Sequence, residues 1–341
     1  IWEPFSNRYE GLHRISRNLY KHIFGNKIIF EELNHDLQTG FQTEWNSSDK
    51  FGFVRKSRLV NHGSEAVRIR LLDGIQNIMP YGVPSSLQAT TSNLVDAYKR
   101  SELDAETGLG IFALSAIIVD KAEPSEALKA NVAWSLGLEK PTCLLSALQL
   151  SAFRQGAAIR QEEDIKAEKG AYFLHKEMVL QPRAEEEWMI VANVNQSPSE
   201  VVKLLDSIKN DRTLHRQVHE DVAIGTKRLV ALNAAADGLQ VTSDHRRDTR
   251  HFSNVLFNIM RGGIFDHNYQ IEKWDFCHYL SKANNTVFES AKPVLDTLPE
   301  VFSLFDLKKI AGQNTNEHFI RLCIEYMPLK FSRRHGDPSR P

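Results

Sequence analysis

The apolar residues of this chain change their spacing near Ser197. Before that point they alternate with polar residues, as in Val67, Ile69 and Leu71, which is the period of a β-strand with one buried face. After it they recur every three or four residues, the period of an amphipathic helix. The pattern therefore predicts a sheet domain followed by a helical domain.

Turn-forming residues separate the strands predicted in the first part. Gly25-Asn26 lies between predicted strands 18–24 and 27–33, and glycine suits a tight hairpin because it accepts a positive φ. Two further strands, 51–60 and 66–73, flank a polar turn at 61–64. Several such strands joined by short turns predict an antiparallel sandwich.

Three later stretches complete this picture of the sheet. Residues 109–119 are apolar at both odd and even positions, which is typical of a central strand that is covered on both faces. Alternation returns at Trp188–Val194. For Pro124–Trp134 the pattern fits a helix and a strand equally well, so both stay open.

Helix signals begin at Ser197. Ser197, Pro198 and Glu200 form a capping box with proline at a position that needs no N–H donor. Breaks are predicted at Asn284-Asn285 and at Pro293. The apolar stripes of the predicted helices lie at 201–208, 252–259 and 319–326.

Composition limits the partners and the compartment. The 341 residues carry 42 Lys and Arg against 43 Asp and Glu, so no broad field favours a nucleic acid or an anionic membrane. No apolar run approaches the ~20 residues that span a bilayer. Three scattered cysteines fit a reducing compartment, and we expect a cytoplasmic protein. Because the first residue is Ile1, the true N-terminus and a removed signal stay open.

Common catalytic and metal-binding patterns are weak or missing. His215 and His219 stand four apart on a predicted helix, but the metalloprotease glutamate is not between them, so we assign no metal. The sequence has neither a standard phosphate-binding loop nor a Gly-x-Ser-x-Gly elbow. The acidic runs 162–164 and 185–187 are interpreted as solvated surface.

Two polar clusters in the second part are the candidate substrate-binding residues. Residues 261–269 combine an arginine, two glycines and aromatic rings, a mixture suited to sugar hydroxyls and the apolar sugar face; a capped helix with an exposed charge is the alternative. Residues 333–341 form a cationic loop that could meet phosphate or hydroxyls, or remain a solvated tail. The substrate-binding residues predicted from these clusters are Arg261, Phe265, Asn268, Arg333, Arg334, His335 and Asp337.

These clusters, with 25–35, 72–78 and 120–124, resemble glycoside hydrolase family 94, the cellobiose phosphorylase type. Within that family the segments look closest to the subgroup that includes 1,2-β-oligoglucan phosphorylases. The resemblance implies a β-super-sandwich of the galactose-mutarotase kind at 1–196, a helical linker at 197–238, and the incomplete start of an (α/α)6 barrel at 239–341. Arg261 would then lie near the sugar that donates its anomeric carbon.

The same resemblance implies an inverting glycoside phosphorylase that converts β-linked gluco-oligosaccharide and phosphate to glucose 1-phosphate. The family's general acid is an aspartate in a Trp-Asn-Asp setting, whereas Trp45-Asn46 is followed here by Ser47, so we expect no catalytic residue in this chain. Phosphate would be a co-substrate, with no cofactor. The expected partners are the oligosaccharide, phosphate and the remainder of the polypeptide, with a homodimer left open. A non-catalytic carbohydrate-binding or scaffolding module, or part of an inverting hydrolase, are the alternatives.

Overall fold

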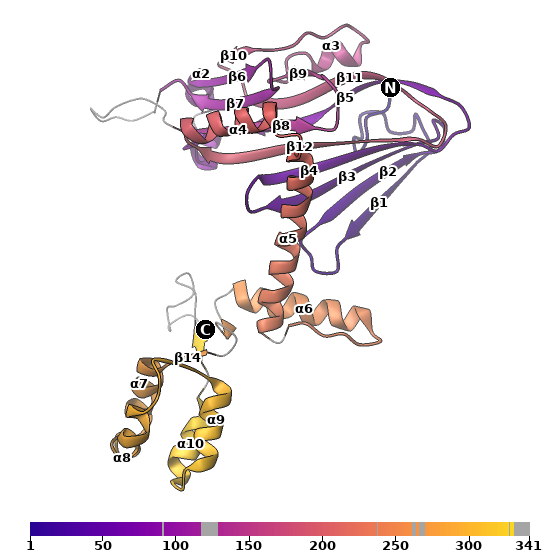
Figure 1. Ribbon diagram of the computed structural model, residues 1–341. Coiled ribbons are helices and arrows are strands. Elements are labelled where there is room, and N and C mark those ends of the chain that lie inside the picture. The colour runs from indigo at the N-terminus through magenta and orange to yellow at the C-terminus, as the bar shows by residue number, and fades with distance from the viewer. Residues whose placement is uncertain are drawn as a thin grey trace. The chain divides into compact units, whose positions relative to one another are not determined.

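The chain is divided into two compact units, Ile1–Gly225 and Thr226–Pro341, and each is described by itself (Figure 1). The first unit ends inside the predicted linker, because helices α4 (Pro198–Asn210) and the first half of α5 (Leu214–Ala235) pack on the sheet. The computed structural model describes residues 1–90, 92–116, 129–236, 238–260, 264–265, 270–326 and 328–330.

The larger sheet of the first unit is antiparallel and, within the described residues, has nine strands. The predicted hairpin around Gly25 is confirmed, although Lys21 pairs with Ile28 and the turn is therefore longer than two residues. In spatial order the strands are β1 (Ile15–Lys21), β2 (Ile28–Asn34), β3 (Thr39–Ser48), β4 (Gly52–Asn61), β12 (Glu185–Gln196), β8 (Ala130–Leu136), β7 (Leu109–Leu114), β6 (Lys99–Asp104) and β10 (Asp164–Lys166).

A smaller sheet packs on the inner face of the larger one. Its described strands are β5 (Val67–Ile78), β11 (Gly170–Leu180) and β9 (Thr142–Leu144), in that order. Aromatic and aliphatic side chains from both sheets, including Phe41, Tyr172 and Trp188, share one core. The predicted antiparallel sandwich followed by helices is thus confirmed. Short helices α1 (Ser85–Thr90), α2 (Ser92–Ala97) and α3 (Leu150–Arg154) lie in its connections.

The turn after β4 carries the chain from one sheet to the other, so the two strands that flank residues 61–64 are not a hairpin. Asn61 holds this crossing: its side-chain amide donates to the carbonyls of Glu65, Leu180 and Gln181. A buried ion pair ties the sheets together nearby, with Arg55 Nη2 of β4 2.6 Å from Asp73 Oδ1 of β5.

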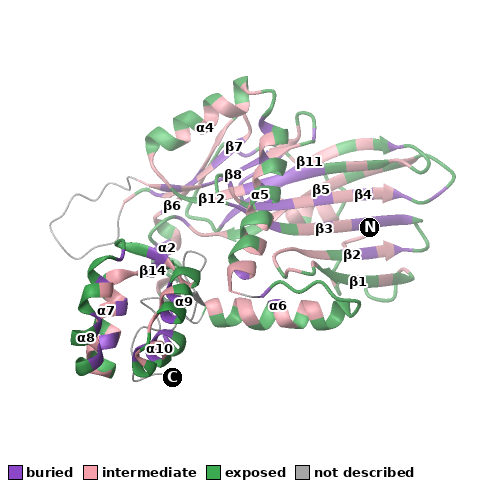
Figure 2. Ribbon diagram, turned by 60° about the horizontal axis from the view of Figure 1, so that its bottom comes forward, coloured by how far each residue is buried: buried purple, intermediate pink, exposed green. Residues whose placement is uncertain are grey.

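The middle of the larger sheet is covered on both faces (Figure 2). Leu109, Trp134 and Val191 on its outer face pack against α4 and α5, whose stripe at Val201–Ile208 faces this core. The predicted capping box of Ser197 and Glu200 is present. The alternation at 188–194 predicts that one face of β12 is exposed to solvent. This prediction is wrong at 188–191, where all four residues are buried. The open choice for Pro124–Trp134 resolves as strand from Ala130, and 124–128 lie outside the described residues.

The second unit contains α6 (His245–Met260) and a four-helix group with a core of its own. The predicted stripe at Phe319, Leu322 and Tyr326 is buried in this core. The predicted break at Asn284 separates two of its helices, whereas Pro293 lies inside one of them and does not end it. The elements are β14 (Gln270–Glu272), α7 (Lys273–Ala283), α8 (Asn285–Asp296), β15 (Val301–Ser303), α9 (Leu304–Gln313) and α10 (Glu317–Glu325).

The two ends of this four-helix group meet. Strand β13 (Ile264–Phe265) pairs antiparallel with β16 (Leu329–Lys330), so entry and exit lie side by side. That residues 239–341 begin an (α/α)6 barrel stays a prediction, since α7–α10 close their core among themselves. Within the described part of the chain, every helix is too short or too polar to cross a bilayer.

Candidate functional site

The predicted substrate-binding residues fall almost entirely outside the described part of the chain. Phe265 lies in β13, and its side chain is not described. The substrate site proposed from the two polar clusters therefore stays a prediction. The residues outside the described ranges are Arg261, Asn268, Arg333, Arg334, His335 and Asp337.

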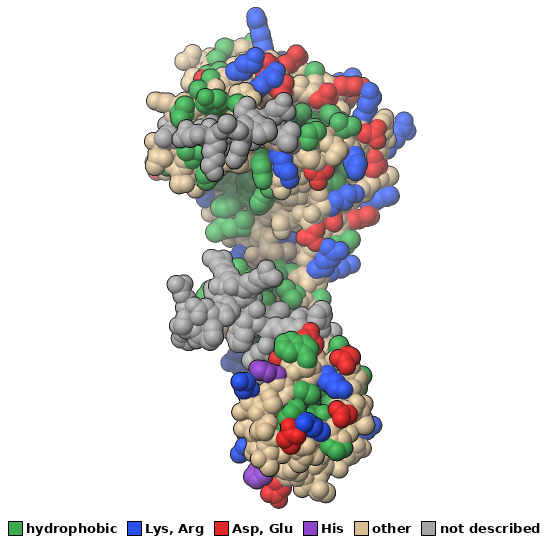
Figure 3. All heavy atoms as spheres, turned by 90° about the vertical axis from the view of Figure 1, so that its left-hand side faces the viewer, with side chains coloured by type: hydrophobic (Ala, Val, Ile, Leu, Met, Phe, Trp, Pro, Cys, Tyr) green, Lys and Arg blue, Asp and Glu red, His purple; other side chains and the backbone are tan. Residues whose placement is uncertain are grey.

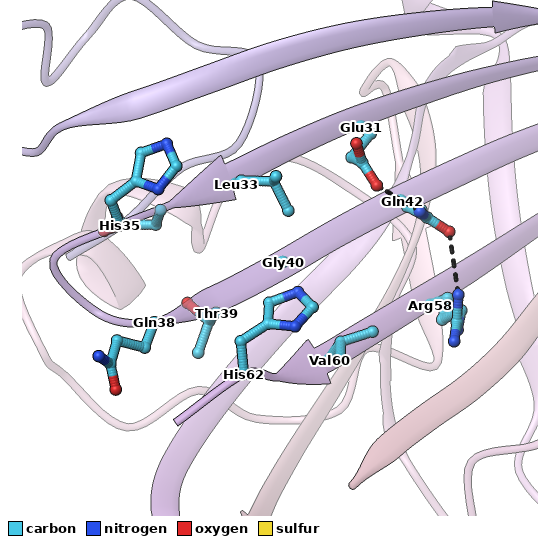
Figure 4. A pocket seen from close by; sticks show the side chains of 11 residues that line it. Glu31, Leu33, His35, Gln38, Thr39, Gly40, Gln42, Arg58, Val60 and His62 are labelled. Atoms are coloured by element: carbon cyan, nitrogen blue, oxygen red, sulfur yellow. Dashed lines mark hydrogen bonds between the residues drawn. The ribbon is translucent and has the colours of Figure 1, made fainter. Parts of the chain in front are cut away.

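A polar cavity of about 440 Å³ lies on the outer face of the larger sheet, and we call it the outer-face pocket (Figure 4). Its floor is made by three adjacent strands, β2, β3 and β4, and its rim by the turn between β2 and β3 and by His62. The lining residues are Glu31, Leu33, Asn34, His35, Gln38, Thr39, Gly40, Gln42, Arg58, Val60 and His62.

Strand register places the polar side chains of the floor in one row. Glu31 pairs with Gln42, and Gln42 pairs with Arg58, so all three project from the same face. Gly40 leaves the space beside them open. A Cβ built on Gly40 would lie 2.8 Å from Nε2 of His62, so the His62 ring needs a glycine beneath it.

The carboxylate of Glu31 is a hydrogen-bond acceptor held in place by neighbouring side chains in the pocket. It is buried, and it accepts hydrogen bonds from Tyr20 Oη at 2.9 Å, Asn18 Nδ2 at 2.8 Å and Gln42 Nε2 at 2.5 Å. A carboxylate has about four lone-pair positions, so roughly one remains for a ligand donor. Arg58 Nη1 donates to Gln42 Oε1 at 3.5 Å, and Arg58 Nε donates to the exposed carboxylate of Glu185. The row of hydrogen bonds therefore extends from Glu31 to Glu185.

The carboxyl of Glu31 stays ionised near neutral pH. Burial alone would raise its pKa, but the hydrogen bonds from Asn18, Gln42 and Tyr20 and the nearby His62 outweigh burial and lower the pKa below its usual value. The same hydrogen bond raises the pKa of Tyr20. A general acid needs a raised pKa to hold its proton, so Glu31 is suited to binding rather than to proton donation.

Two buried polar groups of the pocket lining lack partners. Asn34 Nδ2 and Thr39 Oγ1 have no hydrogen-bond partner among the described residues, although Asn34 Oδ1 accepts from the backbone of Leu37 at 2.9 Å. Buried polar groups are normally satisfied by protein or water. Register pairs Asn34 with Thr39 on the same face as Glu32 and Phe41, opposite to Glu31 and Gln42, so these two buried atoms face the interior of the sandwich and not a ligand in the outer-face pocket.

A second, smaller cavity of about 190 Å³ continues the outer-face pocket along the sheet. Both cavities are lined by Gln42 and Arg58, and the second adds Glu44, Lys56 and Glu187. Lys56 Nζ lies 2.9 Å from Glu187 Oε2. Together they form a groove rich in donors and acceptors, and the residues that line it include no Phe, Tyr or Trp.

The two acidic runs have structural roles. Glu162 is buried, contrary to the expected solvated surface, and its Oε2 accepts from the backbone of Leu145 and Ser146 at 2.8 Å each. It thereby anchors the loop before α3. Glu185 and Glu187 are exposed and pair with Arg58 and Lys56.

His215 and His219 lie on α5 with ring centroids 4.7 Å apart. Burial and the charges of His215 and Lys56 lower the pKa of His219. No third ligand joins them, since the described residues contain no group of three or more His, Cys, Asp or Glu placed around a common point. We therefore assign no metal to His215 and His219.

Sequence reasoning did not find the outer-face pocket. The segment 25–35, which contains Glu31 and His35, drew attention only through the family resemblance. The pairing of Glu31, Gln42 and Arg58 depends on strand register, and only the alternation of polar positions in each strand hinted at it.

Comparison with family models finds a match to one segment of this chain. Residues 265–328 match the model of glycoside hydrolase family 149 insertion domain 1. The match covers the four-helix group, begins in β13 and ends at residue 328, directly before β16. It supports the resemblance to the N-terminal part of a glycoside phosphorylase-like protein, with family 149 rather than 94 as the matched family. No curated protein sequence matches the chain.

Solved structures show only distant similarity. A bacterial glucoamylase complexed with acarbose aligns at a TM-score of 0.38 and 11% identity, covering 65% of this chain and 29% of that one. A putative kojibiose phosphorylase from the human microbiome aligns at 0.33 and 9%, covering 76% and 26%. A putative aldose 1-epimerase from Klebsiella pneumoniae aligns at 0.22 and 11%, covering 54% and 56%. These TM-scores are too low to establish a shared fold. The chain spans under a third of the first two.

Proposed function

We propose that this chain is the N-terminal part of an inverting glycoside phosphorylase acting on β-linked gluco-oligosaccharides. The observation that carries the proposal is the match of residues 265–328 to a glycoside hydrolase family 149 insertion domain. A sandwich precedes this segment in the chain, as the resemblance implies.

In the proposed reaction an aspartic acid outside this chain protonates the leaving glycosidic oxygen while phosphate attacks the opposite face of the sugar. The product is glucose 1-phosphate with inverted configuration. Phosphate is already an anionic nucleophile, so a second catalytic carboxylate is not required. Arg333 and Arg334 would screen its charge, Arg261 would lie near the sugar that donates its anomeric carbon, and no cofactor takes part.

The test is an assay of the whole polypeptide with β-linked gluco-oligosaccharides and inorganic phosphate. We expect phosphate-dependent formation of α-glucose 1-phosphate, followed by NMR at the anomeric carbon. Replacement of Arg261 by methionine should lower the rate. Release of free glucose at the same rate without phosphate would instead identify a hydrolase, and α-glucose as the first-formed anomer would identify it as inverting.

A second candidate function is carbohydrate binding by the sandwich, supported by the outer-face pocket with its ionised Glu31 and its row of Gln42 and Arg58. Sugar hydroxyls both donate and accept, so they complement such a mixed lining.

Titration calorimetry of chain 1–341 with gluco-oligosaccharides tests this second function. Arg58→Met should weaken binding by about 10- to 150-fold, since a polar contact to a charged group contributes ~1.5–3 kcal/mol. Arg100→Met is the matched control, because Arg100 is equally half-exposed and also pairs with carboxylates on a strand. Absence of saturable binding would leave scaffolding as the role of the sandwich.

A further inference from the structure

The floor of the outer-face pocket is apolar. Leu33 pairs with Gly40, and Gly40 pairs with Val60, so these three residues form one row across β2, β3 and β4. They lie on the same face as Glu31 and Gln42, because each is two positions along its strand from a member of the polar row. Two aliphatic side chains that flank a glycine make a floor suited to the C–H face of a sugar ring.

The polar row of Glu31, Gln42 and Arg58 closes the pocket on one side (Figure 4). Gln42 and Arg58 line both this pocket and the smaller cavity beyond, so the row stands between the two spaces. Gln42 is bonded to Glu31 at 2.5 Å and to Arg58 at 3.5 Å, which holds the row together. A chain of linked sugars would have to cross this row to occupy both cavities.

The opposite side of the pocket is closed by the turn between β2 and β3 and by His62. The backbone N–H of His62 donates to the carbonyl of Gln38 at 2.7 Å, which ties the turn to the end of β4. His35, on the same rim, has its Nε2 2.7 Å from Ser16 Oγ. The enclosed volume of about 440 Å³ lies near the lower end of the ~300–1,000 Å³ found for small-molecule sites. These two sides favour a ligand of one ring.

One charged oxygen of the pocket can still accept a hydrogen bond. Glu31 Oε2 accepts from Asn18 and Tyr20, whereas Oε1 accepts from Gln42 and keeps about one lone-pair position. The charge of Arg58 is countered by two carboxylates of β12. Histidine side chains are ordinarily neutral at pH 8. At that pH the pocket therefore favours a hydroxyl donor and repels an anion.

We propose that the outer-face pocket is a site for one uncharged pyranose ring, with the C–H face of the ring on Leu33 and Val60 and one hydroxyl donating to Glu31 Oε1. This inference rests on the second candidate function, carbohydrate binding by the sandwich, and narrows its ligand. The site takes glucose or the end residue of a gluco-oligosaccharide. It excludes glucose 1-phosphate, and so it distinguishes the uncharged sugar from the phosphorylated product of the proposed reaction.

Titration calorimetry of chain 1–341 at pH 8 compares glucose, glucose 1-phosphate and a series of β-linked gluco-oligosaccharides of increasing length. We expect the oligosaccharides to bind within about threefold of glucose, and glucose 1-phosphate to bind at least about tenfold more weakly. An affinity that rises with each added unit would overturn the single-ring site while leaving carbohydrate binding by the sandwich intact. No saturable binding of any of these sugars would refute both.

Glu31→Gln tests the role of the charge, because it keeps the shape of the side chain. We expect it to weaken glucose binding by about tenfold and to reduce the discrimination against glucose 1-phosphate to under about threefold. Glu44→Gln is the matched control: Glu44 lies on the same face of β3 but lines the smaller cavity, so its substitution should change neither. Unchanged discrimination in Glu31→Gln, or an equal loss in Glu44→Gln, would contradict the site.

Gly40→Ala tests the floor without changing a charge. The added methyl group would lie 2.8 Å from His62 Nε2 and 3.0 Å from Leu33 Cδ2, so these flexible side chains must shift while the strand register is kept. We expect glucose and the oligosaccharides to bind at least about tenfold more weakly, and by the same factor, because one floor receives one ring in each case. Native affinity for glucose in a folded Gly40→Ala protein would rule out this placement.

Discussion

Replacing Asp73 with alanine would leave the guanidinium of Arg55 buried without its carboxylate. Both side chains of this pair are about nine-tenths buried. Asp73 also accepts from Ser57 Oγ at 3.0 Å and Trp188 Nε1 at 2.7 Å, so the substitution removes the acceptor of three residues. Breaking a buried pair by removing one partner costs about 3–5 kcal/mol.

That cost is large beside the whole stability of a domain, which is about 5–15 kcal/mol. For a unit of the size of Ile1–Gly225, each kcal/mol shifts the melting temperature by about 2–4 °C, so a fall of roughly 6–20 °C is expected. Urea unfolding followed by fluorescence of the buried Trp134 and Trp188 measures the change.

Two further variants decide whether the buried charge is the cause. Asp164→Ala breaks the half-exposed pair with Arg100 and should cost under ~1 kcal/mol. Arg55→Met combined with Asp73→Ala removes both charges and should be more stable than Asp73→Ala alone. A loss below ~1 kcal/mol for Asp73→Ala, or no recovery in the double variant, would refute this account.

Three smaller effects follow from other contacts. The pKa of Glu31 is lowered from 4.5 in the folded state, so its ionised form stabilises the fold above that pH; the stability difference between the native chain and Glu31→Gln should shrink as pH falls below about 4.5 in urea titrations. Ser303→Ala removes the acceptor for the Asp306 N–H at the start of α9 and should lower the unfolding free energy by about 1 kcal/mol, while an unchanged melt would contradict the cap. Burial raises the pKa of Cys323 to about 12, so iodoacetamide at pH 8 should label it only after unfolding, as peptide mass spectrometry would show.

The charged surface agrees with the near-zero net charge of the sequence. On the face of the first unit seen in Figure 3, cationic and anionic side chains lie intermixed rather than in a patch of one sign. Pairs such as Arg100 with Asp164 and Lys56 with Glu187 are examples from the strands.

The sequence by itself determined features that depend on neighbours along the chain. Alternation set the strands, Gly25 marked a hairpin, and Ser197 with Glu200 marked the start of α4, because each signal acts within a few residues. The change of period at Ser197 likewise separated sheet from helices.

Only the tertiary structure decided which strands meet. Residues 61–64 are the predicted turn between two strands, but those strands belong to different sheets, and Arg55 meets Asp73 because of that crossing. The buried Glu162 and the row of Glu31, Gln42 and Arg58 likewise depend on partners distant in sequence. A strand's pattern fixes which face is buried, but long-range register and packing choose the partner that covers it.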